Sequence, residues 1–479
     1  MKLSHIAYTL SGLLLILSGS FLLPLAFSLY FQEGLHRLFG VQMAAMLTAG
    51  LGLRWLIPRP DHLSLREGFL IVSLSWVVMS FLGALPFILS GFIPSLTDAF
   101  FETMSGFTTT GASILKDIEA LPKSLLVWRS MTHWLGGMGV IALAVAIFPS
   151  LGVGAGQLFK AEAPGPIKEK ISPRISETAK ILWMVYLLFT VTETLLLMIG
   201  GLDFFESLCT TFGSLATGGF SPRNASIAAY PSPYIHYTVI FFMFISGANF
   251  NLHYFFLKGR WTVYGRDSEF RFYGGVVLLA SGLIVLIRFI GGKALSEDLF
   301  RGSLFQTVSL LTTTGFISDD YEHWPLATHI ILLFLMFIGG CTSSTGGAIK
   351  NIRIQILLKQ IVSELKKLFH PHGVFPIKIG NKPIPDNTVS NVMGFFILYV
   401  LLFSFSVLAM TWLGLELDTS IGAVAATLGN VGPGMGTVGP VDNYFHIPGL
   451  GKWILYFLLL AGRLEIYTVL VIFLPRFWR

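Results

Sequence analysis

Charged residues are scarce in this chain. Only 12% of its 479 residues are charged, whereas 53% are hydrophobic and the mean hydropathy is +0.72. Ordinary soluble domains carry about 25% charged residues, so the composition excludes a soluble globular protein. Uncharged runs such as 68–97, 130–159 and 389–414 exceed the roughly 20 helical residues needed to cross a bilayer. The sequence therefore predicts an all-α polytopic membrane protein.

Cysteine is nearly absent, and clusters of catalytic residue types are absent as well. Cys209 and Cys341 lie in apolar or glycine-rich segments, which predicts two free thiols and no disulfide framework. The 11 histidines are scattered, and the two in "HPHG" (370–373) lack further ligands nearby, so they are expected at the surface. "GVGAG" (152–156) follows a hydrophobic span rather than a strand, which argues against a dinucleotide loop. We expect neither an enzyme nor a bound cofactor.

Ten hydrophobic segments are long enough to be transmembrane spans. We place them at 7–30, 38–57, 67–91, 126–150, 178–200, 234–257, 272–291, 326–360, 390–414 and 451–474. The first is interpreted as an anchor rather than a removed signal peptide, because no small-residue cleavage site followed by a soluble domain is present.

The net charge of +6 comes from basic residues on one side of these spans, which argues against nucleic-acid binding. If the spans alternate, that side carries 22 of the 32 Lys and Arg: Lys2, Arg54, Arg59, Arg66, Lys160, Lys168, Lys170, Arg174, Lys180, Lys258, Arg260, Arg266, Arg271, Lys350, Arg353, Lys359, Lys366, Lys367, Lys378, Lys382, Arg476 and Arg479. The positive-inside rule identifies it as the cytoplasmic side, with both termini inside.

One short pattern recurs four times. "SGFTTTGAS", "GSLATGGFS", "LLTTTGFIS" and "TLGNVGPGM" contain Gly111, Gly218, Gly315 and Gly432 at positions that we interpret as equivalent. Each copy follows a span and a short apolar segment, and each precedes another span. An acidic residue (Asp98, Asp203, Asp298 or Asp418) opens each short segment, and N-capping explains these acids better than direct ion binding.

Such repeats predict a pathway for a cation. Non-helical backbone is tolerated at membrane depth only where protein buries it or where it lines a watery cavity. Glycine permits backbone conformations in which successive carbonyls point the same way, and a ring of carbonyls can replace the hydration shell of a cation. The short helices would also direct their negative C-terminal ends towards the ion.

The four repeats, the additional N-terminal pair of spans and the strings "GGCTSSTGGAIKNIR" (339–353) and "GRLEIYTVLVIFLP" (462–475) resemble the Trk/Ktr/HKT superfamily of potassium transporters. The N-terminal pair distinguishes the chain from the eight-span KtrB type and favours the membrane subunit of a bacterial Trk system. The resemblance implies four M1-pore helix-M2 repeats with pseudo-fourfold symmetry. It also implies a bacterial inner-membrane homodimer with one pore per protomer and a cytosolic, nucleotide-binding, TrkA-like ring as partner.

The resemblance also implies which residues contact the transported potassium ion. They are Thr109, Thr110, Gly111, Ala216, Thr217, Gly218, Thr313, Thr314, Gly315, Asn430, Val431 and Gly432. Sodium-preferring plant relatives have serine at the first filter glycine, so glycine at all four positions favours potassium. The fourth copy departs from the pattern, because Pro433 fixes φ and removes a hydrogen-bond donor.

The expected domains follow the repeats. They are an N-terminal helix pair (1–60), repeat 1 (61–155), repeat 2 (156–260), repeat 3 with an interrupted M2 helix (261–368), and a cytoplasmic hairpin with repeat 4 (369–479). The hairpin is expected within 374–385, around a Gly-Asn turn, and is a docking candidate together with Lys160, Lys168, Lys170 and Arg174.

Residues 339–347 are expected to interrupt the eighth span. Four glycines there cost roughly 1 kcal/mol each relative to alanine in a helix. The family resemblance makes this segment an intramembrane gate loop, and close helix packing through small residues is the alternative. The expected gate residues are Gly339, Gly340, Cys341, Thr342, Ser343, Ser344, Thr345, Gly346, Gly347, Lys350 and Arg463.

Arg463 is expected to donate to carbonyls of this loop, with snorkelling to an interface as the alternative. Glu465 and Glu193 are also charged residues within predicted spans, and Glu193 has no obvious partner in the sequence. A buried carboxylate leaves a second function open, a proton- or sodium-coupled symporter with a carrier-type mechanism. The favoured function is gated potassium uptake, with membrane lipid around the chain and no nucleic acid.

Overall fold

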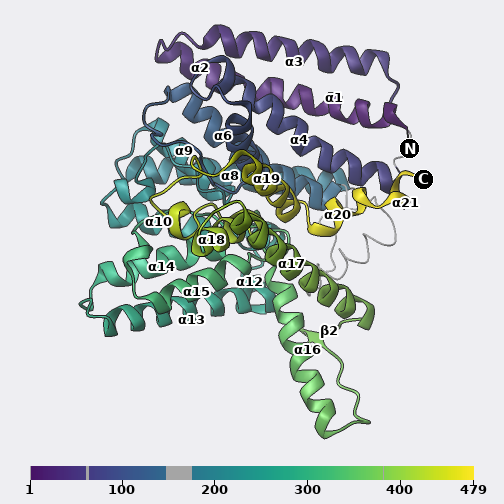
Figure 1. Ribbon diagram of the computed structural model, residues 1–479, viewed down its shortest axis with the longest axis vertical. Helices are drawn as coiled ribbons and strands as arrows, with labels where there is room; N and C mark the ends of the chain where they lie inside the picture. Colours follow the sequence, from purple (N-terminus) through teal and green to yellow (C-terminus); the bar gives the residue numbers. More distant parts are fainter. Residues whose placement is uncertain (1, 61–63, 147–174, 381) are drawn as a thin grey trace.

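The computed structural model describes residues 2–60, 64–146, 175–380 and 382–479, and it consists mainly of long helices (Figure 1). The α-helices are α1 (Leu3–Ser20), α2 (Leu22–Tyr30), α3 (His36–Leu56), α4 (Leu65–Leu89), α5 (Leu96–Phe107), α6 (Lys123–Ala146), α8 (Ile175–Ile199), α9 (Phe204–Leu215), α10 (Pro233–Ser246), α11 (Phe250–Leu257), α12 (Val263–Arg266), α13 (Ser268–Ile290), α14 (Glu297–Leu311), α15 (Leu326–Phe337), α16 (Asn351–Phe369), α17 (Asp386–Trp412), α18 (Leu417–Leu428), α19 (Gly449–Arg463), α20 (Ile466–Leu470) and α21 (Pro475–Trp478). Short 3-10 helices are η1 (Ser226–Ala229), η2 (Tyr321–His323), η3 (Gly436–Val438) and η4 (Val471–Phe473).

Five stretches of the described chain are helical, long and apolar enough to cross a membrane, or seven if each of two bent pairs counts as one span. The five are Leu3–Tyr30, Arg66–Leu89, Ala179–Ile199, Ser268–Ile290 and Asp386–Trp412. The expected total of ten spans therefore stays a prediction.

Several expected spans are broken. α10 and α11 meet at 103°, and α19 meets the segment Ile466–Phe473 at 120°. The expected interruption of the eighth span is present, because α15 ends at Phe337 and α16 begins at Asn351. The spans expected at 234–257 and 451–474 are therefore each divided between two helices in the structure. At the second of these breaks Glu465 has φ +68°, a left-handed conformation that a non-glycine residue rarely adopts.

Four short helices, α5, α9, α14 and α18, lie inside the bundle, and nearly all residues of their second halves are buried. The acids at their starts cap them only in part. Asp203 is the N-cap of α9 and accepts from Glu206 N at 2.6 Å. Ser95 and Ser296 take that role in α5 and α14, and Glu416 precedes α18. The N-cap prediction was thus correct for Asp203 alone.

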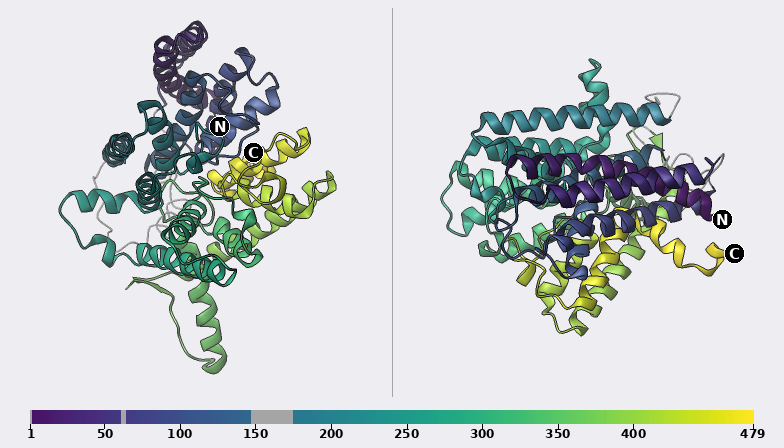
Figure 2. Two further views of the ribbon diagram at one scale, coloured as in Figure 1. Left: turned by 90° about the vertical axis from the view of Figure 1, so that its left-hand side faces the viewer. Right: turned by 90° about the horizontal axis from the view of Figure 1, so that it is seen from above.

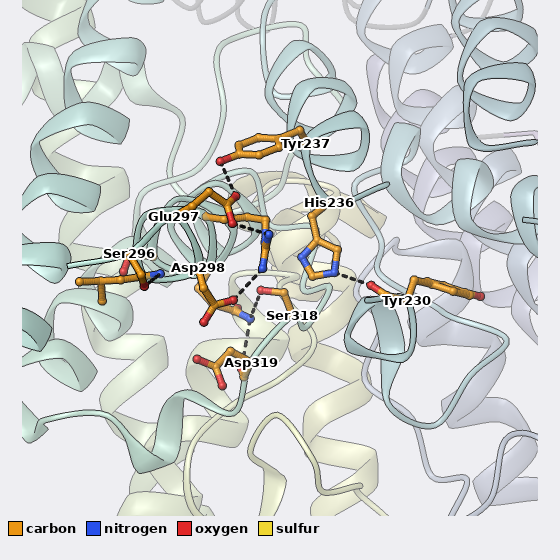
Figure 3. Close-up of polar contacts among 12 residues, drawn as sticks. Tyr230, His236, Tyr237, Ser296, Glu297, Asp298, Ser318 and Asp319 are labelled. Atoms are coloured by element: carbon orange, nitrogen blue, oxygen red, sulfur yellow. Dashed lines mark hydrogen bonds and ion pairs between the residues drawn. The ribbon is translucent and has the colours of Figure 1, made fainter. Parts of the chain in front are cut away.

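The other acids lie in the first helical turn, where carboxylates also favour the positive end of a helix dipole. Figure 3 shows Glu297 and Asp298 at the start of α14, where Tyr237 donates to Glu297 at 2.9 Å. Arg301 donates to each of the two carboxylates at 2.6 Å. Asp98 of α5 pairs with Lys452 of α19 at 2.6 Å.

Helix α16 extends away from the bundle, and both chain ends lie at the same end of the long helices (Figures 1 and 2). The expected hairpin is present: β1 (Lys378–Ile379) pairs antiparallel with β2 (Lys382–Pro383). Its apolar side chains pack with Ile352 and Ile356 of α16. The proposed domain boundary at 155/156 lies outside the described residues.

Candidate ion pathway

The four short helices end in the same backbone geometry. Their C-caps are Thr108, Ala216, Thr312 and Gly429, and the next residues have left-handed φ values: Thr109 +50°, Thr217 +53°, Thr313 +61° and Asn430 +54°. In the first copy, Thr109 N donates to Gly106 O and Thr110 N to Ser105 O, both at 2.9 Å. The other three copies repeat both bonds. This pair of bonds is the Schellman C-cap.

Glycine usually occupies the left-handed position of this cap, and threonine there is unusual because its branched Cβ crowds the backbone. Such strain persists only where the surrounding structure fixes it, and it clusters at functional sites. Two residues later each segment has a glycine with positive φ: Gly111 +87°, Gly219 +79°, Gly315 +76° and Gly432 +101°.

This geometry corrects the register of the second copy. The sequence pattern predicts that Ala216, Thr217 and Gly218 are equivalent to Thr109, Thr110 and Gly111. The structure aligns Thr217, Gly218 and Gly219 with them, and Ala216 is the helix C-cap. Because "ATGG" contains two adjacent glycines, only the φ values identify the equivalent one. The other three triplets keep the predicted alignment.

We call 108–111, 216–219, 312–315 and 429–432 the helix-end segments. They contact one another in a closed cycle. A Cβ atom added to Gly111 would overlap the carbonyl oxygen of Gly218. An added Cβ on Gly219 would likewise collide with Thr314 O, one on Gly315 with Val431 O, and one on Gly432 with Thr110 O. Each positive-φ glycine therefore lies against a carbonyl of the next segment, and no side chain fits between them.

The helix-end segments are of two kinds. In the first segment the hydroxyls of Thr108 and Thr110 lie 2.9 Å apart, and in the third segment those of Thr312 and Thr314 lie 2.7 Å apart. The second and fourth segments have Ala216 with Gly218 and Gly429 with Val431 at these positions. The fourth is linked to the first by Asn430, whose Nδ2 donates to Thr110 Oγ1 at 3.1 Å.

The non-helical segment 338–350 packs directly against the helix-end segments. Gly347 N donates to Thr313 Oγ1 at 2.7 Å, and Thr345 Oγ1 donates to Leu215 O at 3.1 Å. A Cβ on Gly347 would lie 2.7 Å from Gly429 O. The segment thus contacts the ends of α9, α14 and α18.

The same segment is held by the break between α10 and α11. Cys341 N donates to Gly247 O at 2.8 Å, and Phe250 N donates to Ser343 O at 3.2 Å. These bonds satisfy backbone groups that a helix would otherwise pair, which is required at membrane depth.

Arg463 makes the contact that the sequence analysis predicted. This buried side chain donates from Nη1 to Thr345 O at 2.6 Å. Its Nε and Nη2 have no partner within the part of the chain that the structure describes. Lys350 Nζ donates to Gly346 O, so two cationic groups reach carbonyls of the segment.

Glu269 was missed by the sequence analysis. It lies in the first turn of α13, is buried, and accepts from Thr342 N at 2.7 Å and from Thr342 Oγ1 at 3.0 Å. The two residues are 73 positions apart, and no local pattern links them.

The two acids left open by the sequence have partners. Glu193 of α8 accepts from Ser214 Oγ of α9 at 2.5 Å, and its Oε2 has no partner among the described residues. Glu465 pairs with Arg353 of α16 at 2.6 Å. The proposed docking residues Lys160, Lys168, Lys170 and Arg174 lie outside the described residues.

Within the described ranges, no three His, Cys, Asp or Glu side chains come together as a metal site. The oxygens of the helix-end segments are backbone carbonyls, threonine hydroxyls and the amide oxygen of Asn430. These are hard ligands suited to alkali cations rather than to transition metals.

Comparisons with known proteins identify the family of this chain. The model of the family TrkH, described as "Cation transport protein", matches residues 38–289 and 293–479. The Trk system potassium uptake protein TrkH of Escherichia coli (strain K12) is 45% identical over 477 residues, covering 98% of both chains. TrkG of the same strain is 33% identical over 491 residues, covering 100% of both. The crystal structure of the potassium transporter TrkH from Vibrio parahaemolyticus matches with a TM-score of 0.92 and 37% identity, covering 100% of both chains. The chain therefore belongs to the TrkH family of cation transport proteins.

Proposed function

We propose that this chain takes up potassium across the bacterial inner membrane through the ring of helix-end segments, which acts as a selectivity filter. The observation that carries this proposal is the closed cycle of glycine-to-carbonyl contacts among Gly111, Gly219, Gly315 and Gly432. Four M1-pore helix-M2 repeats with pseudo-fourfold symmetry would produce such a cycle. The printed names of the relatives, which are potassium uptake proteins, support the choice of ion.

The chemistry of the ring favours a dehydrated monovalent cation. The four short helices direct their C-terminal ends, which carry partial negative charge, at the cycle. Glycine at the third position of each filter segment lets the adjacent carbonyls pack without a side chain between them. The filter residues are Thr109 to Gly111, Thr217 to Gly219, Thr313 to Gly315 and Asn430 to Gly432, with Ala216 as the C-cap behind the second segment.

The segment from Gly339 to Gly347 acts as the gate. It contacts the ends of three short helices, and the positive charge of Arg463 lies against one of its carbonyls. A cation leaving the filter therefore meets both a steric and an electrostatic barrier. Opening requires movement of the segment, for which a cytosolic TrkA-like nucleotide-binding ring supplies free energy through α16. The protein works as a homodimer with one pore per protomer and with both termini in the cytoplasm.

A coupled symporter is the second candidate, and Glu193 is the observation that favours it. Its buried carboxyl group has one oxygen without a partner among the described residues, close to the end of α9. A carrier that moves a proton with potassium would use such a group.

The test is potassium flux into proteoliposomes that contain the purified chain alone or together with the TrkA-like nucleotide-binding ring, called the ring partner below. The proposal predicts potassium-dependent currents that exceed those of empty vesicles and that rise with the partner. No flux above empty vesicles in either preparation would contradict it.

A further inference from the structure

A buried ion pair lies directly behind the first two helix-end segments. Glu102 of α5 and Arg129 of α6 are almost fully inaccessible to solvent, at 1% and 2% exposure, and Arg129 Nε lies 2.6 Å from Glu102 Oε1. Taking two charges out of water is costly, and an apolar pair of similar size often stabilises a protein equally well. Fold stability alone is therefore a weak explanation for the pair.

The remaining bonds of the carboxylate go to the chain that leaves the first helix-end segment. Glu102 Oε1 accepts from Ser113 Oγ at 2.9 Å, and Glu102 Oε2 accepts from Ile114 N at 2.9 Å. These residues follow Gly111 by two and three positions. Described partners thus account for both carboxylate oxygens.

The guanidinium group holds the corresponding part of the second segment. Arg129 Nη1 donates to Ser221 O at 3.0 Å, and its central carbon lies 3.5 Å from the centre of the Phe220 ring. Ser221 follows Gly219 by two positions, as Ser113 follows Gly111. The ion pair therefore links the residue two positions after Gly111 to the residue two positions after Gly219, and these are equivalent positions of the first and second segments.

The third segment has a neutral counterpart. Gln306 precedes Thr313 by seven positions, as Glu102 precedes Thr109. Its amide nitrogen donates to Asp319 O at 3.3 Å, in the chain that leaves the third segment, and lies 3.5 Å from Ser318 Oγ. The same pore-helix position thus contacts the outgoing chain in the first and third copies. It is Ala423 in the fourth, which has no polar side-chain atom.

We propose that Glu102 and Arg129 are positioning residues that set the ion selectivity of the pathway by fixing the backbone beyond Gly111 and Gly219. This inference rests on the proposed function. The pair does not touch the ion. Because the outgoing chains are held on both sides of the pair, the carbonyls of the two segments keep the spacing that suits potassium, and release of either chain lets them close on the smaller sodium ion.

The experiment measures the sodium-to-potassium permeability ratio from reversal potentials in proteoliposomes. Glu102→Gln keeps the size of the side chain and removes its charge, and Arg129→Lys keeps the charge and removes the planar group that reaches Ser221. Each should raise the ratio about tenfold, which corresponds to ~1.4 kcal/mol. Because the two residues act as a unit, Glu102→Gln combined with Arg129→Lys should not exceed the larger single effect.

Arg301→Gln is the matched control. Arg301 lies on the short helix α14 and pairs with Glu297 and Asp298, which are 53% and 77% exposed. These ion pairs do not involve the chain that leaves a helix-end segment, so Arg301→Gln removes a charge and leaves that chain held. It should leave the ratio unchanged, and an equal rise would show a general effect of charge near the short helices and overturn the proposal. Wild-type ratios in both pair variants, purified as folded protein, would also overturn it. If Gly315→Ser altered the ratio while the pair variants did not, the filter assignment would survive and the positioning role would fall. If all three left it unchanged, the filter assignment itself would fall.

Discussion

If the helix-end segments form the filter, Gly315→Ser should lower the potassium-to-sodium permeability ratio. Gly315 has φ +76°, and a Cβ atom there would overlap Val431 O and lie 2.7 Å from Pro433 Cδ. Real Cβ atoms essentially never come closer than 3.0 Å to such neighbours. Val431 O belongs to the backbone of the fourth helix-end segment, and Pro433 Cδ belongs to the rigid proline ring that follows it, so the added side chain must displace a carbonyl that we assign to the filter.

The backbone conformation of Gly315 sets the expected change in the permeability ratio. A non-glycine residue held at positive φ costs about 1–3 kcal/mol. If the segment relaxes instead, its carbonyls move and the binding free energy of the ion changes by a comparable amount. Since each 1.4 kcal/mol is a factor of about ten, we expect the potassium-to-sodium permeability ratio to fall at least about tenfold.

The assay is a reversal-potential measurement in proteoliposomes with potassium on one side and sodium on the other. Gly275→Ser is the control, because Gly275 lies in α13 and a Cβ there meets no atom within 4 Å. The control should keep the wild-type ratio. Unchanged ratios in both Gly315→Ser and the equivalent Gly111→Ser would refute the assignment of selectivity to the glycines.

Three further outcomes are expected. A Cβ on Gly218 would collide with the His133 ring, whereas one on Gly219 would collide with backbone, so His133→Ala should restore flux to Gly218→Ala but not to Gly219→Ala; equal rescue of both would contradict the corrected register. Arg463→Ala should raise potassium flux measured without the ring partner, because it removes the donor to Thr345 O, and wild-type flux from a folded dimer would argue against the gate. Lys378→Glu on the hairpin should weaken co-purification of the ring while leaving potassium flux without the ring unchanged, and full retention of the ring would exclude docking there.

The breaks that depend on local sequence could be predicted. The four glycines within 339–347 predict an interrupted helix, and the structure has non-helical chain from 338 to 350. Arg463 could be assigned to this segment because a buried guanidinium needs carbonyl acceptors, and its contact with Thr345 O follows that logic. The hairpin around Gly380 was likewise predictable from its turn residues.

Features that depend on distant partners could not be predicted. Glu269 holds Thr342 across 73 positions, and Glu102 holds Arg129 across 27, with no local pattern in either case. The break after Arg463 has a left-handed Glu465 rather than glycine or proline, so tertiary contacts such as the pair with Arg353 determine it. The second helix-end segment was misaligned for a different reason, since either of two adjacent glycines satisfies the pattern.

Passage of potassium through the carbonyl ring, as proposed, differs from coupled transport in how the flux depends on other ion gradients. The most direct measurement is the reversal potential of proteoliposomes containing the chain and its ring partner, under a fixed potassium gradient, with and without added proton and sodium gradients. A selective pore predicts a reversal potential close to the potassium equilibrium potential in every condition. A reversal potential that moves systematically with the proton or sodium gradient would contradict this account and favour a coupled carrier that uses Glu193.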